Sequence, residues 1–214
     1  MRSFLEIENV LRRKTDFRRV SFAVPCPYEV SILAAISDGV EKGFCKGILV
    51  GDREKIEETA IKANVNLSSF EILEEKDDMR AIELSCSLLV DDTVSCLMKG
   101  LVHTGSFLRG VLQQKSLSES SLLTHIAVYE IPNRDLLFIS DPSIIVHPNV
   151  EQKKVIILNA LRVMKQVGIS PRRVAVLSSV ETPTPAVPSS MEAFEVVCAL
   201  RFSLSQEEYI DGPL

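Results

Sequence analysis

Between residues 20 and 114 the chain alternates short runs of β-branched and apolar residues with longer stretches of helical periodicity. The predicted strands are 20–24, 47–50, 70–73 and 95–98. The predicted helices are 29–42, a stretch that starts after Asp52, 77–90 and 104–114. Strands that alternate with helices of roughly 10–15 residues need crossover connections, which favour a parallel sheet. The pattern therefore predicts an α/β fold with mainly parallel strands.

The rhythm changes near residue 120. The apolar runs 124–130 and 136–139 flank Pro132-Asn133-Arg134-Asp135, which predicts an antiparallel hairpin. We expect a domain boundary within 120–148, with a first α/β domain over 1–125 and a second over 126–214.

The second half also carries two patterns that are typical of helix starts. Asn149 with Gln152 predicts a capping box for a helix that ends at Gly168. Ser189 with Glu192 predicts a second capping box, for a helix that reaches about Leu200. Between them, 173–177 is a predicted strand.

Charge and hydropathy argue against two classes of partner. The net charge is −5 and the pI about 5.4, whereas a nucleic-acid partner favours a basic face. Charged residues follow Met1 at once, so no apolar signal region is present, and no apolar run approaches the ~18 residues that span a bilayer. We expect a soluble, cytoplasmic protein without a nucleic-acid or membrane partner.

The cysteines and histidines do not form a recognisable metal or disulfide pattern. The five cysteines include no C-x-x-C pair, and we expect all five to be buried structural thiols. His103, His125 and His147 are far apart in the sequence, which argues against a metal site.

The first candidate site follows the predicted strand 95–98. Lys99 and Gly100 come at its end, and Thr104, Ser106 and Arg109 lie in the next helix. Parallel sheets bind ligands at the carboxyl ends of their strands, where helix N-termini offer free N–H groups. These cations and hydroxyls would suit a phosphate. Arg109 could reach the same phosphate only if its side chain bends back. Ordinary capping with surface charges is the alternative.

Two further candidates follow predicted strands of the second half. Asp141 closes one strand before Pro142, where it either caps a turn or contacts a ligand. Ser178, Ser179 and Glu181 precede a proline-rich loop that would hold them in place. Glu181 is a candidate general acid or base, and turn stabilisation is the alternative.

Together these stretches resemble the phosphate acetyl/butyryl transferase family, and most closely its phosphate butyryltransferase branch. The matching stretches occur in the family's order: 48–52, 97–104, 107–109, 140–148, 151–153, 159–160, 174–181, 188–193 and 211–214. The Met98-Lys99-Gly100 stretch and the strand that ends in Glu181 are the specific ones.

The resemblance implies a two-domain α/β/α layered fold like that of isocitrate and isopropylmalate dehydrogenases, with the site in the cleft between the domains. It implies transfer of a short-chain acyl group between coenzyme A and inorganic phosphate, by a homodimer with no bound cofactor and no metal. Lys99, Arg109 and Glu181 would then be catalytic. Substrate would also be bound by Gly100, Thr104, Ser106, Asp141, Ser178 and Ser179.

The last four residues, Asp211-Gly212-Pro213-Leu214, read as the opening of a motif. In the family this motif is followed by further strands and helices, so we expect a chain that is shortened at its C-terminus and incomplete as an enzyme. Two other functions stay open: a non-catalytic remnant that binds phosphate or acyl phosphate, and a dehydrogenase of similar architecture. The dehydrogenase is disfavoured because no Gly-x-Gly-x-x-Gly turn is present.

Overall fold

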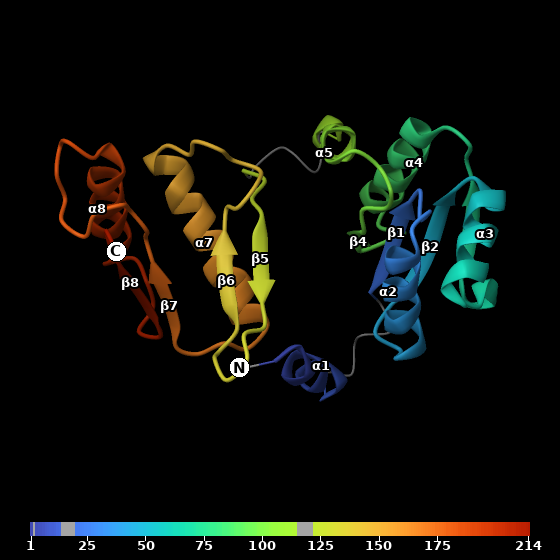
Figure 1. The fold of residues 1–214 in the computed structure, drawn as a ribbon, viewed down its shortest axis with the longest axis horizontal. Coiled ribbons are helices and arrows are strands. Elements are labelled where there is room, and N and C mark those ends of the chain that lie inside the picture. The colour runs from blue at the N-terminus through green and yellow to red at the C-terminus, as the bar shows by residue number, and fades with distance from the viewer. Residues whose placement is uncertain (2, 14–19, 115–121) are drawn as a thin grey trace. The chain divides into compact units, whose positions relative to one another are not determined.

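The computed structural model describes residues 1, 3–13, 20–114 and 122–214 (Figure 1). The chain forms two compact units. The sheet unit comprises Leu11–Ser121, and the hairpin unit comprises Met1–Val10 with Leu122–Leu214. The predicted α/β class with mainly parallel strands is confirmed.

The sheet unit is built on four parallel strands in the order β3-β2-β1-β4. The strands are β1 (Ser21–Pro25), β2 (Lys46–Gly51), β3 (Glu71–Glu74) and β4 (Cys96–Leu97). The helices between and after them are α2 (Val30–Glu41), α3 (Arg53–Ala63), α4 (Asp78–Val90) and α5 (Thr104–Gln113), with a 3₁₀ turn η2 (Leu67–Ser69) before β3. Every strand and helix predicted for this half is confirmed to within a few residues.

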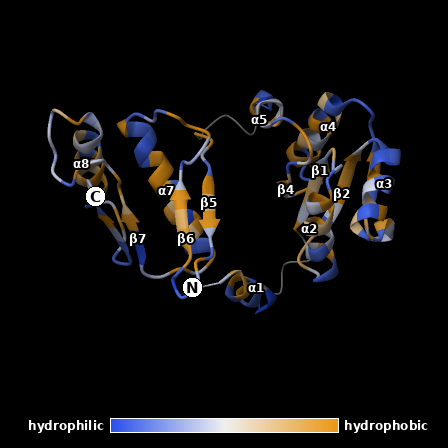
Figure 2. Ribbon diagram, viewed as in Figure 1, coloured by the Kyte–Doolittle hydropathy of each residue, from blue (hydrophilic) through white to orange (hydrophobic). Residues whose placement is uncertain are grey.

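Helices cover both faces of this sheet. Successive residues of a strand point to opposite faces, so Ala23 packs with Ala81 of α4, whereas Val24 packs with Leu33 of α2 and Ile56 of α3. Because both faces are buried, β1 and β2 are nearly continuous apolar runs. In Figure 2, β2 is largely hydrophobic and α3 largely hydrophilic.

Side-chain caps start two of these helices. The Asp52 carboxylate accepts a hydrogen bond from the Glu54 N–H at 3.0 Å, as predicted, and Asp77 accepts from the Arg80 N–H at 2.9 Å. Both helices begin within a few residues of the strand before them, which places their N-termini at the carboxyl edge of the sheet.

The hairpin unit contains two small sheets and two long helices. An antiparallel pair, β5 (Ile126–Tyr129) and β6 (Leu137–Ser140), confirms the predicted hairpin. A parallel pair follows, β7 (Arg172–Ala175) and β8 (Glu208–Asp211). Helices α7 (Val150–Gln166) and α8 (Pro188–Leu200) pack against each other through Ile157, Leu161, Val196 and Val197.

One of the two predicted capping boxes is present. Asn149 accepts from the Gln152 N–H at 2.8 Å, and Gln152 accepts from the Asn149 N–H at 3.0 Å. The Ser189 box is wrong, because Val187 is the N-cap of α8 and makes no side-chain cap. Pro188 opens the helix, so Ser189 lies inside it and its hydroxyl contacts Ser178 at 2.9 Å.

The first residues of the chain group with the hairpin unit. The N-terminal helix α1 (Phe4–Arg13) begins there, where the Phe4 N–H donates to Glu130 at 2.7 Å. The Met1 carbonyl accepts from the Leu136 N–H at 3.0 Å. The compact units therefore divide at 121/122 and separate Met1–Val10 from the sheet unit, whereas the sequence pattern predicts 1–125 as one domain.

Strand β8 and the last residues extend along β7. The Val176 N–H donates to the Asp211 carbonyl at 2.8 Å, and the Ser178 N–H donates to the Leu214 carbonyl at 2.8 Å. Arg172, buried at the start of β7, pairs with Glu208 at 3.1 Å. The Ser205 backbone N–H and the Arg172 guanidinium hold the pKa of Glu208 below its usual range. No sequence pattern predicted β8.

Candidate functional site

The loop from β4 to α5 is fixed against the end of β1. The Met98 N–H donates to the Ala23 carbonyl at 2.9 Å, and the Leu101 N–H donates to the Cys26 carbonyl at 2.8 Å. Residues 98–103 thus lie at the carboxyl edge of the parallel sheet, where open α/β sheets bind their ligands.

Gly100 is the point of closest approach in this loop. A Cβ at this position would lie 1.9 Å from the Pro25 carbonyl oxygen and 2.4 Å from that of Cys26. Only glycine lets two backbones approach so closely. The spacing between Lys99 and the first turn of α5 therefore depends on Gly100.

The first turn of α5 has free donors. His103 is the N-cap and makes no side-chain cap, so no side chain caps the first N–H groups of the helix. The positive end of the helix dipole lies at the same place. Within the described part of the chain, the side chains of Thr104, Ser106 and Arg109 make no hydrogen bond or ion pair. The Lys99 ammonium is exposed and donates to the Gly100 carbonyl at 3.3 Å.

Four of the predicted site residues therefore lie in this loop and the first turn of α5: Lys99, Gly100, Thr104 and Ser106. The fifth, Arg109, lies farther along the helix. Ser106 and Arg109 are three residues apart and share a helix face. Thr104 lies on another face from Arg109, so Arg109 reaches a ligand of Thr104 only by bending back, as the spacing suggests.

A pocket of about 460 Å³ adjoins the loop. It lies between the first turns of α4 and α5 and is lined by Asp78, Met79, Ile82, Leu101, Val102, His103 and Ser106. Its volume falls within the roughly 300–1,000 Å³ that is usual for small-molecule sites. Of the predicted phosphate ligands, only Ser106 lines it.

A close helix contact shapes this pocket. Gly110 of α5 is buried, and a Cβ there would lie 2.5 Å from the Ile82 Cγ2 atom. The missing side chain lets α5 approach α4 closely, and Ile82 of α4 fills the contact opposite Gly110.

Cys26 and Asp78 link the pocket to the end of β1. Cys26 is fully buried, and its thiol donates to the Asp78 carboxylate at 3.4 Å. Burial, with the neighbouring charge and hydrogen bond of Asp78, raises the pKa of the Cys26 thiol to about 12. Sequence patterns missed both residues, although Cys26 between two prolines at a strand end, and a second aspartate after the Asp77 cap, were visible signals.

Asp141 is fully engaged by the backbone around it. Its Oδ2 atom accepts from the His125 N–H at 2.7 Å, and its Oδ1 atom accepts from Ile144 at 2.7 Å and Ser143 at 3.0 Å. Burial raises the pKa of this carboxyl group, but these donors outweigh it and leave the pKa lowered. This geometry favours the capping interpretation, and a contact of Asp141 with substrate stays a prediction.

Replacing Asp141 with alanine is expected to lower the free energy of unfolding of the hairpin unit by about 2 kcal/mol, because backbone donors lose a charged acceptor. Since the folded pKa is lowered, this stabilisation is present above the ordinary carboxyl pKa and is lost as the pH falls through the folded value. Urea unfolding at pH 7 and at pH 3 measures it. If Asp141→Ala lowered the free energy of unfolding by the same amount at both pH values, the capping role of the Asp141 carboxylate would be contradicted.

The second-half candidates lie after β7. The Ser178 hydroxyl contacts that of Ser189, while Ser179 and Glu181 are exposed. Glu181 makes no hydrogen bond or ion pair with the described residues. Its carboxylate is available to a ligand, and its role stays a prediction.

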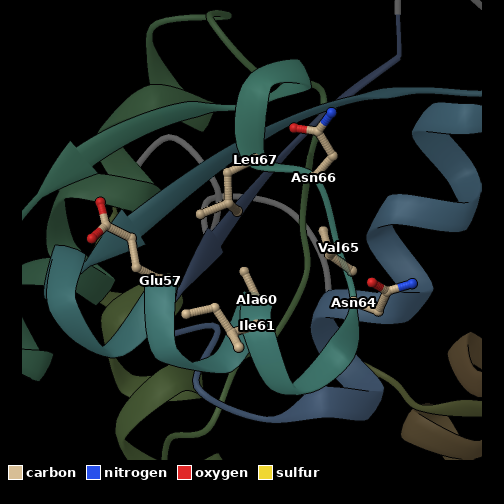
Figure 3. Close-up of a pocket in the computed structure, with 7 residues that line it drawn as sticks. All are labelled: Glu57, Ala60, Ile61, Asn64, Val65, Asn66 and Leu67. Carbon is tan, nitrogen blue, oxygen red and sulfur yellow. The ribbon is translucent and has the colours of Figure 1, made fainter.

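Another hollow, of about 620 Å³, lies where α3 ends and the chain turns toward β3, at the amino edge of the sheet. Figure 3 shows the side chains that line it. Its side chains come from the end of α3 and the loop after it: Glu57, Ala60, Ile61, Asn64, Val65, Asn66 and Leu67. The only charge among these seven is an acid, so this hollow does not suit a phosphate.

Comparison with known proteins identifies the family. Residues 77–214 match the family described as phosphate acetyl/butaryl transferase. The phosphate butyryltransferase of Clostridium beijerinckii is 34% identical over 207 residues, which are 96% of this chain and 67% of that protein. The chain belongs to the phosphate acetyl/butyryl transferase family. A phosphate butyryltransferase of Clostridium acetobutylicum is 32% identical, over 100% of this chain and 71% of that protein.

Solved structures agree with this family at the level of fold. EutD phosphotransacetylase from Staphylococcus aureus matches 100% of this chain and 74% of its own, with a TM-score of 0.77 at 17% identity. A branched-chain phosphotransacylase from Enterococcus faecalis matches 91% of this chain and 68% of its own, with a TM-score of 0.74 at 20% identity. The chain thus has the fold of the family's phosphate acyltransferases.

The described part of this family member contains no group of three His, Cys, Asp or Glu side chains that could hold a metal ion. None of its described helices is long and apolar enough to cross a membrane.

The cysteines of this family member differ in exposure. Cys26 and Cys86 are buried and Cys45 and Cys96 partly buried, as expected of structural thiols, but Cys198 on α8 is exposed, so that part of the prediction is wrong. Burial raises the pKa of the other four thiols.

Iodoacetamide at pH 8 is therefore expected to modify Cys198 at least tenfold faster than Cys26, because the thiolate is the nucleophile. Peptide mass spectrometry over a time course measures the rates. Equal rates for the two residues in the folded protein would contradict the burial of Cys26.

Proposed function

We propose that this chain carries the phosphate site of an acyltransferase that moves a short-chain acyl group between coenzyme A and inorganic phosphate. The observation that carries the proposal is the backbone contact of Gly100 with Pro25 and Cys26, which holds Lys99 and the α5 N-terminus at one edge of the sheet. Membership of a family of phosphate acyltransferases supports the reaction class.

The proposed ligands of phosphate have complementary chemistry. Lys99 supplies a point charge, Thr104 and Ser106 supply hydroxyl donors, and the first N–H groups of α5 supply oriented dipoles. Arg109 adds a guanidinium fork if its side chain bends back. All of these groups favour a dianion over a neutral ligand.

The reaction needs no covalent enzyme intermediate when both substrates bind together. A phosphate oxygen attacks the thioester carbonyl, the carbonyl oxygen gains negative charge, and collapse of the tetrahedral intermediate expels the coenzyme A thiolate. Fixed donors stabilise such an oxyanion by about 3 kcal/mol each. In the reverse direction the thiol, with a pKa of about 8.5, must lose its proton. We propose Glu181 as the general acid or base, on its availability alone.

Further features of the proposal rest on family membership. These are coenzyme A and acyl phosphate as substrates rather than bound cofactors, a cytoplasmic location and assembly as a homodimer. Light scattering in solution tests the assembly, and a mass of twice 23.8 kDa is the expected result.

Synthesis of acyl-CoA tests the proposed reaction. Coenzyme A mixed with butyryl phosphate and the 214-residue protein is expected to yield butyryl-CoA, separated and quantified by chromatography. No product above the enzyme-free control, while phosphate still raises the melting temperature, would replace the transferase with the phosphate-binding remnant.

A further inference from the structure

We propose that the pocket between α4 and α5 holds the hydrocarbon chain of the acyl phosphate and selects short, uncharged acyl groups. This inference rests on the proposed function, because it places the acyl group next to the phosphate site of the β4–α5 loop.

The pocket is continuous with that loop. Leu101 and Val102 directly follow Gly100, and Ser106 lies both in the first turn of α5 and in the pocket wall. A phosphate bound at the α5 N-terminus therefore has the pocket on its Ser106 side. The acyl group bonded to that phosphate is the part of the ligand that reaches the pocket.

The pocket wall suits a hydrocarbon. Four of the seven lining side chains are apolar: Met79, Ile82, Leu101 and Val102. Ile82 is 1% exposed and forms the base, whereas Met79 and Leu101 are 39% and 52% exposed. An acyl chain would remove these two side chains from water, and each buried methylene should raise affinity about fourfold.

Asp78 gives the pocket a selective charge. Its Oδ1 atom is held by the Cys26 thiol at 3.4 Å, while the residue lines the pocket. No ion pair with another described residue neutralises this carboxylate. An acyl group with a terminal carboxylate would meet a like charge, so the pocket should reject it by at least about fivefold.

Alkylphosphonates test the inference, because they carry a stable phosphate-like head and a chain of chosen length. Calorimetric titration should show dissociation constants that fall about fourfold per methylene from methyl- to propylphosphonate. 3-Phosphonopropionate should bind at least fivefold more weakly than propylphosphonate, and Asp78→Asn should remove that difference. Leu101→Ala should flatten the chain-length dependence and leave the affinity for inorganic phosphate unchanged.

Leu112→Ala is the matched control, since Leu112 is also on α5, is 53% exposed and does not line the pocket. It should keep the full chain-length dependence. Phosphate binding with equal affinities for all alkylphosphonates would overturn the pocket assignment alone. No binding of phosphate or of any phosphonate would overturn the proposed phosphate site, and the pocket assignment with it.

Discussion

Gly100→Ala is expected to lower the free energy of unfolding of the sheet unit by about 3 kcal/mol and to abolish phosphate binding. The new methyl group would overlap the Pro25 and Cys26 carbonyl oxygens at 1.9 and 2.4 Å. Both are backbone atoms of the strand end, so no side-chain rotation relieves the overlap, and overpacking of this kind costs roughly 1–3 kcal/mol even where side chains adjust. The loop must move instead, and the Leu101–Cys26 hydrogen bond breaks with it.

Urea unfolding measures the loss, and amide exchange in the β1 and β4 peptides assigns it to the sheet unit. Gly105→Ala is the control, because a Cβ at Gly105 meets nothing within 4 Å and lies in the same helix start. That variant should be as stable as the parent or more stable by up to about 1 kcal/mol. A Gly100→Ala protein with parental stability and phosphate affinity would show that the loop does not depend on this contact.

Lys99→Ala is expected to weaken phosphate binding by roughly tenfold to a hundredfold, the range for losing a hydrogen bond to a charged group. The fold should be unaffected, since Lys99 is exposed and its described hydrogen bond is to the neighbouring Gly100 carbonyl. Titration calorimetry with inorganic phosphate measures the affinity, and higher salt should reduce the difference because the lysine is exposed.

Lys46→Ala provides the matched control. Lys46 is an exposed lysine at the start of β2, at the amino edge of the same sheet. Its removal changes the net charge equally but leaves the carboxyl edge intact. If both variants bound phosphate equally more weakly than the parent, net charge would explain the loss of affinity. The assignment of Lys99 as a ligand of phosphate would then be wrong.

The α/β order of the sheet unit could be predicted because its signals are local. The apolar runs of β1 and β2, the cap at Asp52 and the helical periodicity between them each lie within a few residues. The hairpin and the Asn149 capping box were predictable for the same reason.

The rest depends on contacts that are distant in the sequence. Gly100 meets Pro25, Asp78 meets Cys26, and Met1 bonds to Leu136. Local patterns therefore showed that Gly100 lies between Lys99 and Thr104. They did not show why a glycine is needed at position 100, or that a pocket adjoins Ser106. The predicted Ser189 cap was wrong because α8 begins at Pro188, so its N-cap is Val187, two residues before Ser189.

The most direct test of the proposed function is the release of free thiol from butyryl-CoA by the 214-residue protein, with and without inorganic phosphate. We predict release that requires phosphate, saturates with its concentration and needs at least tenfold more phosphate in Lys99→Ala. Release that is independent of phosphate, or that is unchanged in Lys99→Ala, would contradict a phosphate site at the β4–α5 loop.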